Sequence, residues 1–305
     1  RDDVVQIAFR YGLFTGAFGL HYGAEAIGAS VIPISTGNTE KQIMIMQDYK
    51  TTALVCTPGY ALTLAERMEK TGVDARGLSL RVGLFGGEPW SETMRRDIEN
   101  RLSITATDNY GLSEVIGPGV AGECVHKCGM HIAEDAFIPE IIDPLTGETL
   151  PPGQTGELVL TTLTKQAFPM IRFRTRDITS IDYGRCECGR TFVRMKKPSG
   201  RSDDVLIVKG VNVSPAQIRE VLFAAAQGEP RYQIIADRMD SKDALEVRIE
   251  VTEKIFSAEL QNQRSFLEMV RKRIEASIGI HVTVKLVEPG SIPEGEGTII
   301  DKRII

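Results

Sequence analysis

Short apolar runs alternate with stretches of helical length across residues 29–107, and this alternation is the feature that most constrains the fold. The expected strands are at residues 29–34, 53–57, 80–85 and 104–107. The expected helices between them are at residues 39–49, 60–71 and 91–102. Strands that alternate with helices of this length predict βαβ units and a largely parallel sheet.

A different pattern begins near Ala136, where turns instead of helices separate the β-forming runs. The runs at 137–143 and 156–162 flank a segment rich in Pro and Gly, which are typical of hairpin turns. We therefore expect an antiparallel β subdomain over about residues 136–199.

The C-terminal part of the chain mixes both kinds of element. Helices are expected at 214–227 and 257–278, and strands at 232–236, 244–251 and 281–287. This order is typical of a small open sheet with helices on one face. The sequence thus predicts an α/β fold with two domains: a large parallel-sheet domain that carries the β subdomain (1–199), and a small α+β domain (200–305).

A polar segment, Ser199–Asp204, separates the two predicted domains. Short polar linkers absorb backbone rotation at low cost, so we predict a hinge at residues 201–204 and a mobile C-terminal domain. The alternative interpretation is an ordinary solvated loop between domains.

The composition is that of a water-exposed globular protein of two domains. The 36 basic and 41 acidic residues leave a net charge of −5, which gives no reason to expect nucleic acid or a membrane surface as a partner. No apolar segment approaches the roughly 20 residues needed to span a bilayer, and no secretory signal is found, so a cytoplasmic location is expected. The charged opening without an initiator Met predicts a chain that begins inside a domain.

Residues suited to nucleotide chemistry follow the predicted strands, where parallel sheets bind their ligands. Gly86-Gly-Glu88 follows one strand and Tyr110-Gly-Leu-Ser-Glu114 follows the next. Phe173–Asp177 is expected to end a strand in a carboxylate suited to a ribose diol. Each motif alone has an ordinary explanation, since a Gly pair is usually a turn and Tyr110–Glu114 could be a capped helix start.

In combination and in this order, the motifs are much more specific than any one of them alone. They comprise Gly86-Gly-Glu-Pro89, Tyr110-Gly-Leu-Ser-Glu114, Gly156-Glu-Leu158, Phe173-Arg-Thr-Arg-Asp177, Gly200-Arg-Ser-Asp-Asp204 and Lys209-Gly-Val-Asn-Val-Ser-Pro215. With these motifs the chain resembles the adenylate-forming acyl- and aryl-CoA ligases, and most closely the branch that activates phenylacetate. The resemblance covers essentially the whole chain.

The resemblance implies a site for ATP and AMP. Asp177 and Arg201 would hold the ribose, Glu114 would hold Mg²⁺, and Asp203 would be the pivot about which the small domain rotates. Gly86, Gly87 and Glu88 would line the adenine side, and Asp108, Asn109 and Tyr110 would border the base and the phosphate. Gly111 and Ser113 would be further cofactor contacts. Further cofactor contacts are implied at Lys209 and Gly210.

The reaction implied by the resemblance joins an aryl acid, phenylacetate by default, to coenzyme A. The acid and ATP would give an acyl-adenylate and pyrophosphate, and the thiol of CoA would then attack the adenylate. The candidate acid-binding residues are Tyr11, Phe14, Ile116, Gly117 and Pro118, although aromatic residues among glycines more often pack than bind. Dimers are common in the family, so a homodimer is an option.

Two other functions stay open. The phosphate loop of the family, rich in Gly, Ser and Thr, would precede Arg1, and Thr298 follows Glu296-Gly297 where the family has a Lys. One alternative is therefore an inactive fragment that binds a nucleotide or CoA. The other is an adenylating relative that transfers the acyl group to an acceptor other than CoA.

The five Cys residues predict reduced thiols or metal ligands, because their number is odd and no secretion signal is found. The segments 124–131 and 186–188 offer thiols and imidazoles for a tetrahedral structural Zn²⁺. Some relatives of the family carry such positions together, so the preferred ligands are Cys124, His131, Cys186 and Cys188, with Cys128 and His126 in reserve. The alternative is free thiols on two hairpins, and Cys56 is expected in the core.

Overall fold

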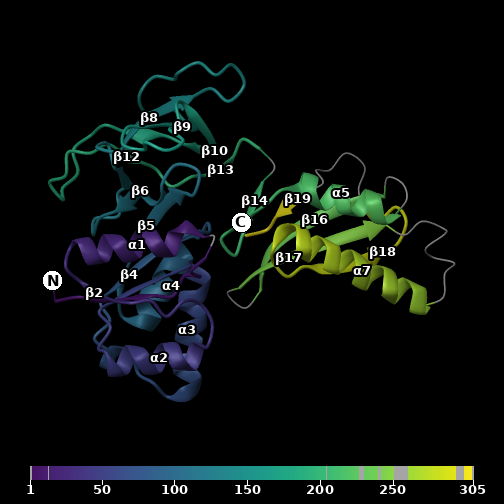
Figure 1. Cartoon of the computed structure of the whole chain (residues 1–305), viewed down its shortest axis with the longest axis horizontal. Helices are drawn as coiled ribbons and strands as arrows, with labels where there is room; N and C mark the ends of the chain where they lie inside the picture. The colour runs from purple at the N-terminus through teal and green to yellow at the C-terminus, as the bar shows by residue number, and fades with distance from the viewer. Residues whose placement is uncertain are drawn as a thin grey trace. The chain divides into compact units, whose positions relative to one another are not determined.

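The computed structural model describes residues 2–12, 14–203, 205–226, 230–239, 242–250, 260–292 and 299–303. The chain divides into two compact units, residues 1–87 with 91–203 and residues 88–90 with 204–305 (Figure 1). The boundary at Asp203 falls inside the segment in which the sequence predicts a hinge, and Asp204 lies outside the described residues. Hinge motion at this boundary remains a prediction.

A nine-stranded sheet forms the centre of the first unit, in the order β11-β12-β7-β6-β5-β4-β3-β1-β2. Its parallel strands are β1 (Val4–Ile7), β2 (Ser30–Ile32), β3 (Ala53–Cys56), β4 (Val82–Gly86) and β5 (Thr105–Leu112). Its antiparallel strands are β6 (Gly117–Glu123), β7 (Met130–Ile132), β11 (Ile181–Asp182) and β12 (Arg194–Met195). The predicted parallel sheet is confirmed, and its antiparallel extension begins upstream of Ala136, where the sequence pattern changes.

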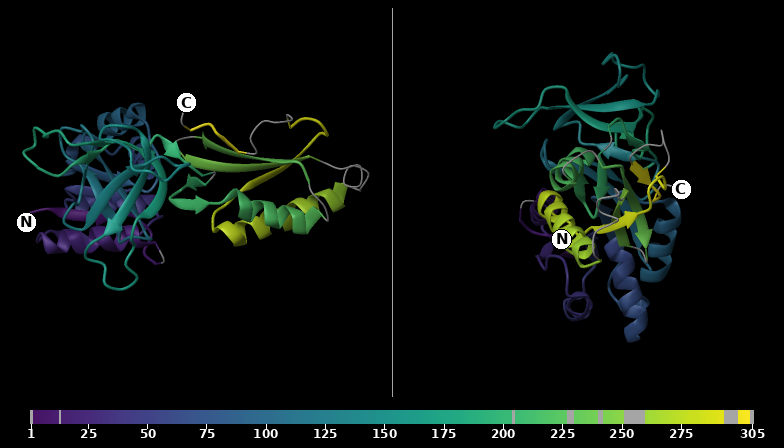
Figure 2. Two further views of the ribbon diagram at one scale, coloured as in Figure 1. Left: turned by 90° about the horizontal axis from the view of Figure 1, so that it is seen from above. Right: turned by 90° about the vertical axis from the view of Figure 1, so that its right-hand side faces the viewer.

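Four helices and a short 3₁₀ turn connect the parallel strands. They are α1 (Thr15–Ala26), α2 (Thr39–Asp48), α3 (Pro58–Thr71), η1 (Ala75–Gly77) and α4 (Glu92–Leu102). Helix α1 lies on one face of the sheet and α3 and α4 lie on the other, as right-handed crossovers require (Figure 2). Ser91 caps α4 by accepting a hydrogen bond from the backbone N–H of Met94.

A second sheet of the same unit is wholly antiparallel, in the order β13-β10-β9-β8. It comprises β8 (Phe137–Ile142), β9 (Gly156–Thr162), β10 (Phe173–Thr179) and β13 (Gly200–Arg201). The predicted antiparallel sheet is confirmed, but β11 and β12, which lie within the predicted bounds 136–199, belong to the nine-stranded sheet. Two further details differ. Part of the expected turn at 199–204 is strand β13, and the prediction that Asp177 ends its strand is wrong, because β10 continues to Thr179.

The second unit has a four-stranded sheet, in the order β18-β17-β16-β19, and a separate hairpin of β14 and β15. Its elements are β14 (Leu206–Val208), β15 (Val211–Val213), α5 (Pro215–Ala226), β16 (Tyr232–Met239), β17 (Lys242–Glu250), α7 (Leu260–Ile278), β18 (Thr283–Val287) and β19 (Ile299–Asp301). Both helices lie on one face of the sheet, as the sequence predicts (Figure 2). Strand β19, which pairs in parallel with β16, is not predicted.

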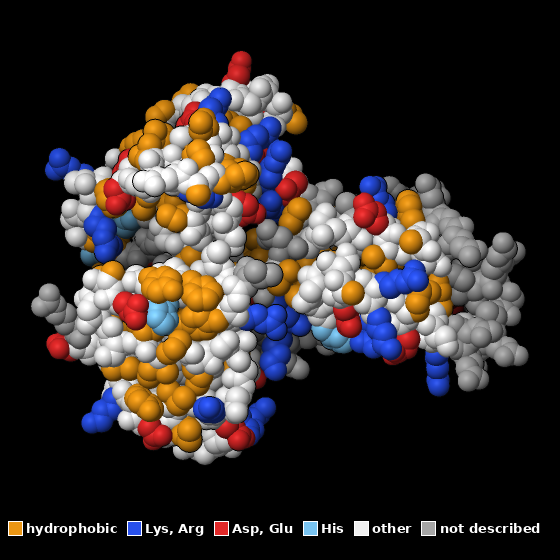
Figure 3. Space-filling view, in the orientation of Figure 1, with side chains coloured by type: hydrophobic (Ala, Val, Ile, Leu, Met, Phe, Trp, Pro, Cys, Tyr) orange, Lys and Arg blue, Asp and Glu red, His pale blue; other side chains and the backbone are white. Residues whose placement is uncertain are grey.

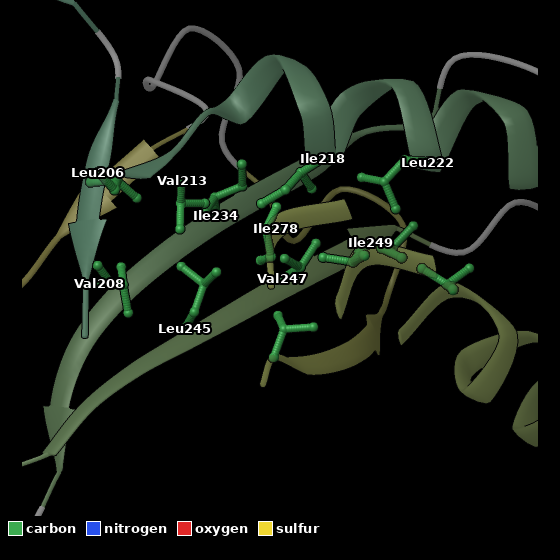
Figure 4. Packing of buried hydrophobic residues seen from close by; sticks show 14 residues of the cluster. Leu206, Val208, Val213, Ile218, Leu222, Ile234, Leu245, Val247, Ile249 and Ile278 are labelled. Carbon is green, nitrogen blue, oxygen red and sulfur yellow. The ribbon is translucent and has the colours of Figure 1, made fainter. Parts of the chain in front are cut away.

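The core of the second unit lies between this sheet and its helices (Figure 4). Side chains such as Ile218 and Leu222 of α5 pack with Leu245 and Val247 of β17, and all four are buried. Fully burying one such side chain contributes about 1.5–3 kcal/mol, so this cluster accounts for much of the unit's stability. Within the described ranges, no helix is long and apolar enough to cross a membrane.

Candidate active site

Strands β5, β10 and β13 and the bend after β13 bring together four side chains that the sequence singles out. The Tyr110 hydroxyl donates a hydrogen bond to Asp177 Oδ2 at 2.5 Å, and Arg201 Nη1 donates one to Asp177 Oδ1 at 3.1 Å. Asp177 and Arg201 are paired residues of the β10–β13 ladder. Arg201 also donates two hydrogen bonds to the Asp203 carboxylate, at 2.7 and 3.0 Å. The four side chains therefore form one connected network.

Burial sets the electrostatics of this network. It raises the pKa of Asp177, whose exposed fraction is 4%, even though Tyr110 and Arg201 act in the opposite direction. Burial also raises the pKa of Tyr110 well above its ordinary value, and the Asp177 charge adds to this effect. Each carboxylate oxygen has two lone pairs, so Asp177 retains acceptor capacity for two hydroxyl groups of a ligand.

A bulge in β10 sets the position of Asp177. The pairing of β10 with β9 is irregular between Arg174 and Ile178, and Arg176 within this stretch has a φ of 69°. The Thr175 hydroxyl donates to a carbonyl of β9 at 2.8 Å and accepts the backbone N–H of Asp177 at 3.1 Å. Bulges of this kind redirect side chains, which explains how a residue inside a strand reaches the network.

The carboxyl end of β4 lies against β5. Gly86 and Asn109 are paired residues, and a Cβ at Gly86 would lie 2.2 Å from the Asn109 carbonyl oxygen, so only Gly fits there. The Nδ2 of Asn109 is buried without a hydrogen-bond partner in the part of the chain that the structure describes. Asp108, also buried, forms an ion pair with Lys197 at 3.3 Å. Glu88, two residues after Gly86, is buried as well.

The turn after β5 carries Ser113 and Glu114, which are both exposed. The hydroxyl groups of Ser113 and Thr15 are 2.9 Å apart, and Lys165 Nζ donates to the backbone carbonyl of Glu114 at 2.6 Å. Gly111 has a packing role, since a Cβ there would lie 2.3 Å from the Gly117 carbonyl oxygen. The Glu114 carboxylate stands in an exposed turn, where a metal ion could reach it.

The candidate acid-binding residues divide into two groups. Phe14 packs on Phe9, with ring centroids 5.4 Å apart, and both rings lie within 4 Å of the position of a Cβ at Gly87. Pro118 packs against α1 at Gly19, and Gly117 packs against Thr15 of the same helix. These contacts bring Phe14, Gly117 and Pro118 to the first half of α1.

Tyr11 and Ile116 have other surroundings. The Tyr11 ring contacts Phe18 edge to face at 5.2 Å, and its hydroxyl lies 3.0 Å from His21 Nδ1. Burial raises the pKa of Tyr11 to about 12. Ile116 is 53% exposed. Hydrophobic side chains also gather on the surface over α1 (Figure 3), where Tyr22 is 62% exposed.

The four preferred metal ligands converge at one point. The ligand atoms of Cys124, His131, Cys186 and Cys188 all lie within 4.8 Å of one another. The Sγ atoms of Cys124 and Cys186 are 3.7 Å apart, and Cys188 Sγ is 3.4 Å from His131 Nε2. Zinc bonds of about 2.3 Å to sulfur and 2.0 Å to nitrogen imply tetrahedral edges of about 3.8 and 3.6 Å. The donor set and its spacing therefore fit Zn²⁺.

The surroundings of the cluster support this fit. His131 Nδ1 lies 3.4 Å from the Phe192 carbonyl oxygen, a contact that leaves Nε2 free to bind a metal. The backbone N–H of Cys188 and the neighbouring thiols lower the pKa of Cys186 to about 6. Of the two reserve residues, Cys128 Sγ lies 3.4 Å from Cys186 Sγ, whereas His126 pairs with Glu187 at 3.4 Å.

In the second unit, Lys209 and Gly210 form the turn between β14 and β15, with φ angles of 52° and 75°. Two consecutive left-handed residues are typical of a tight type I′ hairpin. The backbone N–H of Lys209 lies 3.5 Å from the Asp243 carboxylate, which is buried and forms an ion pair with Arg303 at 2.7 Å. Sequence reasoning missed Asp243 and Arg303, which have no motif. Residues 296–298, where the family has its Lys, lie outside the described part.

Comparison with known proteins identifies relatives over most of the chain. Residues 2–164 match the family described as AMP-binding enzyme, and residues 210–305 match the AMP-binding enzyme C-terminal domain. A phenylacetate-coenzyme A ligase of Thermus thermophilus is 46% identical over 303 residues, which are 95% of this chain and 68% of the relative. One from Escherichia coli is 48% identical over 297 residues, which are 97% of this chain and 67% of the relative. The chain thus spans about two thirds of the length of these relatives.

Among solved structures, one of similar fold is 2-hydroxyisobutyryl-CoA ligase in complex with 2-HIB-AMP and CoA in the thioesterification state. Its TM-score is 0.88 at 26% identity, over 98% of this chain and 65% of that chain. The likeness confirms the predicted fold class, an α/β parallel sheet with an antiparallel sheet and a small C-terminal domain. By these sequence matches, the chain belongs to the AMP-binding enzymes and, among them, to the family of phenylacetate-coenzyme A ligases.

Proposed function

We propose that this protein is an AMP-forming acid–thiol ligase that joins an aryl carboxylic acid, phenylacetate, to coenzyme A through an acyl-adenylate. The observation that carries the proposal is the network of Tyr110, Asp177 and Arg201, found in a chain whose relatives are phenylacetate-coenzyme A ligases. The structural neighbour with an acyl-AMP and CoA supports the same pair of steps.

In this proposal, the nucleotide lies along the carboxyl ends of β4 and β5. The Asp177 carboxylate accepts hydrogen bonds from the two ribose hydroxyls through its remaining lone pairs, and Arg201 keeps that carboxylate oriented. Asn109 offers its Nδ2, which has no protein partner in the described residues, to the base. Gly86 and Gly87 let the ligand approach the backbone, and Asp108 borders the same edge. Glu88, the residue after Gly87, stays a proposed contact to adenine by the family resemblance.

Glu114, Ser113 and Gly111 belong to the phosphate side of the proposed site. The exposed Glu114 carboxylate suits Mg²⁺, which prefers oxygen ligands and offsets the charge that develops on the phosphates. Ser113 offers a hydroxyl group to a phosphate oxygen. These assignments come from the family resemblance and the exposure of the turn.

The acid lies in this proposal beside the first half of α1. Phe14 offers an aromatic face next to Gly87, and Gly117 and Pro118 contact the same half of the helix at Thr15 and Gly19. Tyr11 and Ile116 remain candidates, with Tyr11 joining the site through Phe18.

The two steps need different surroundings, and the proposed hinge provides both. Asp203, at the boundary of the two units, is the proposed pivot, and Lys209 and Gly210 on the β14–β15 turn are proposed cofactor contacts of the rotating part. Such rotation would let one site exclude water during adenylation and then admit the CoA thiol.

The cluster of Cys124, His131, Cys186 and Cys188 is proposed as a structural zinc site. Bound zinc would cross-link the segments that carry these residues and stabilise them. Three thiolates and one imidazole leave no open position for a reactant, so the proposed role is separate from ligation.

The test uses ATP, Mg²⁺, CoA and a panel of aryl and alkyl acids, with release of pyrophosphate and formation of a thioester measured separately. We expect both products, with phenylacetate the best substrate. Pyrophosphate without thioester would instead favour transfer to another acceptor. Nucleotide binding with no pyrophosphate from any acid would favour an inactive binding protein.

A further inference from the structure

Glu157 on β9 is a buried carboxylate to which the proposed reaction assigns no role. Its side chain is fully buried, and it accepts two hydrogen bonds from Arg174, at 2.9 and 2.6 Å. Its Oε2 also accepts the hydroxyl of Ser202 at 2.9 Å and lies 3.8 Å from Arg176 Nη1. A buried charge needs such partners to offset its desolvation, and here they come from β10 and from the residue that follows β13.

These partners are the sequence neighbours of the proposed ribose-binding pair. Arg174 and Arg176 belong to the bulged stretch of β10 that places Asp177, and Ser202 directly follows Arg201. The backbone N–H of Ser202 donates to the Arg176 carbonyl oxygen at 2.6 Å, which adds a second link between the same segments. One carboxylate on β9 therefore ties the bulge of β10 to the end of β13.

The hydrogen bonds of Glu157 add to those of Arg201 with Asp177 and Asp203 in fixing the end of β13. This strand has two residues, Gly200 and Arg201, and it ends at the boundary of the two units. A two-residue ladder is weak by itself, since short pairings gain little against the entropy of ordering the chain. Hydrogen bonds from Ser202 to Glu157 and Arg176 extend the ordered stretch beyond Arg201.

We propose that Glu157 and Ser202 are positioning residues that hold Asp177 and Arg201 in the geometry that binds the ribose; this inference rests on the proposed function. Neither residue touches the ligand. Both act by holding the bulge and the end of β13 together.

Ser202 is the cleaner residue to test, because Ser202→Ala leaves the Glu157–Arg174 pair intact. AMP is titrated into the full-length protein and into the variants by calorimetry. Loss of one hydrogen bond should weaken AMP binding roughly two- to tenfold in Ser202→Ala. Ser202→Thr should restore the affinity, since it returns the hydroxyl at an exposed position.

Ser199→Ala is the matched control. Ser199 lies in the same connecting segment, but its hydroxyl donates to the Ile178 carbonyl oxygen at 3.3 Å instead of reaching Glu157. The AMP affinity of the Ser199→Ala variant should equal that of the parent. In a double-mutant cycle, Glu157→Gln and Ser202→Ala should be less than additive in AMP affinity, because both remove the same link.

Hydrogen exchange gives a second readout that needs no nucleotide. Ser202→Ala should speed exchange in peptides that cover residues 175–178 and 200–203, whereas Ser199→Ala should not. Equal exchange and equal AMP affinity in Ser202→Ala and the parent would overturn the inference. If the parent binds no AMP, the proposed function fails. Unchanged hydrogen exchange in Ser202→Ala would by itself overturn the proposed link between Glu157 and Ser202.

Discussion

Gly19 of α1 lies against Pro118 of β6 so closely that a Cβ on Gly19 would be 2.5 Å from Pro118 Cγ. This contact sets how near α1 can approach the sheet at the proposed acid-binding residues. A side chain of any size at Gly19 would force the helix or the strand to move.

The first prediction follows from this contact. Gly19→Ala should destabilise the protein by about 1–3 kcal/mol, because overpacking outweighs the roughly 1 kcal/mol that Ala gains over Gly in a helix. Gly23→Ala in the same helix is the control, since nothing lies within 4 Å of its Cβ position. That variant should be as stable as the parent or more so. Thermal unfolding of the two variants and the parent measures the order of their stabilities. A Gly19→Ala variant more stable than the parent would contradict the packing argument.

The second prediction concerns the proposed ribose site. Asp177→Asn should weaken AMP binding by roughly tenfold or more, because hydrogen bonds to a charged group contribute about 1.5–3 kcal/mol. Asp97→Asn, which alters an exposed carboxylate on α4, should leave AMP binding unchanged. Calorimetric titration measures the AMP affinity of both variants. Equal affinity in Asp177→Asn and the parent would show that Asp177 does not bind the ribose.

The third prediction is a pH dependence at Glu157. Burial would raise its pKa, but hydrogen bonds from Arg174 and Ser202 and the nearby arginine charges hold the folded-state pKa below the ordinary 4.5. A carboxylate with a lowered pKa adds stability above its unfolded-state pKa, and that stability is lost as the pH falls through the folded-state value. The difference in unfolding free energy between the parent and Glu157→Gln should therefore be full near neutral pH and shrink below pH 4.5.

Urea unfolding at several pH values measures this difference. Near neutral pH we expect about 1–3 kcal/mol, since Arg174 loses its charged partner. The control is Glu140→Gln, which alters the exposed Glu140–Arg172 pair on the neighbouring strand and should cost less than about 1 kcal/mol. A difference for Glu157→Gln that does not vary with pH would contradict the lowered pKa.

The fourth prediction tests the metal. Protein purified from zinc-supplemented medium should contain one zinc ion per chain, and Cys188→Ser should lose it. Chelation should lower the melting temperature of the parent, because metal binding contributes to the stability of the folded state. Cys56→Ala should keep the zinc, since Cys56 is buried in β3 away from the cluster. Zinc-free parent protein with freely reactive thiols would exclude the site.

The fifth prediction concerns the second unit. Asp243 and Arg303 form an ion pair whose side chains are 1% and 2% exposed, so Asp243→Asn should cost about 3–5 kcal/mol by leaving a buried charge without its partner. Arg248→Gln, which breaks the partly exposed pair with Glu246, should cost less than about 1 kcal/mol. Thermal unfolding followed by circular dichroism compares the stability of the two variants. An equal loss of stability in both would contradict the role of burial.

The parallel sheet and the small C-terminal domain could be predicted because their signal is local. Alternating runs of apolar and helical residues specify β3, α3, β4 and α4 within one or two residues. Ser91 marks the start of α4 correctly because capping depends on a few neighbouring atoms. Strands β6, β7, β11 and β12 were not predicted, because β6 contains three Gly and one Pro and the other three strands have only two or three residues each.

The sequence alone determined the fold class, the family and the residue types of the proposed site, because motif order and periodicity are properties of the chain itself. Only the tertiary structure decided that Asp177 sits in a bulge, that Arg201 pairs with it across a two-residue strand, and that Glu157 ties the two together. The physical reason is that these contacts join residues 17 to 67 positions apart, and no local pattern specifies which distant groups will share a buried charge or a hydrogen bond.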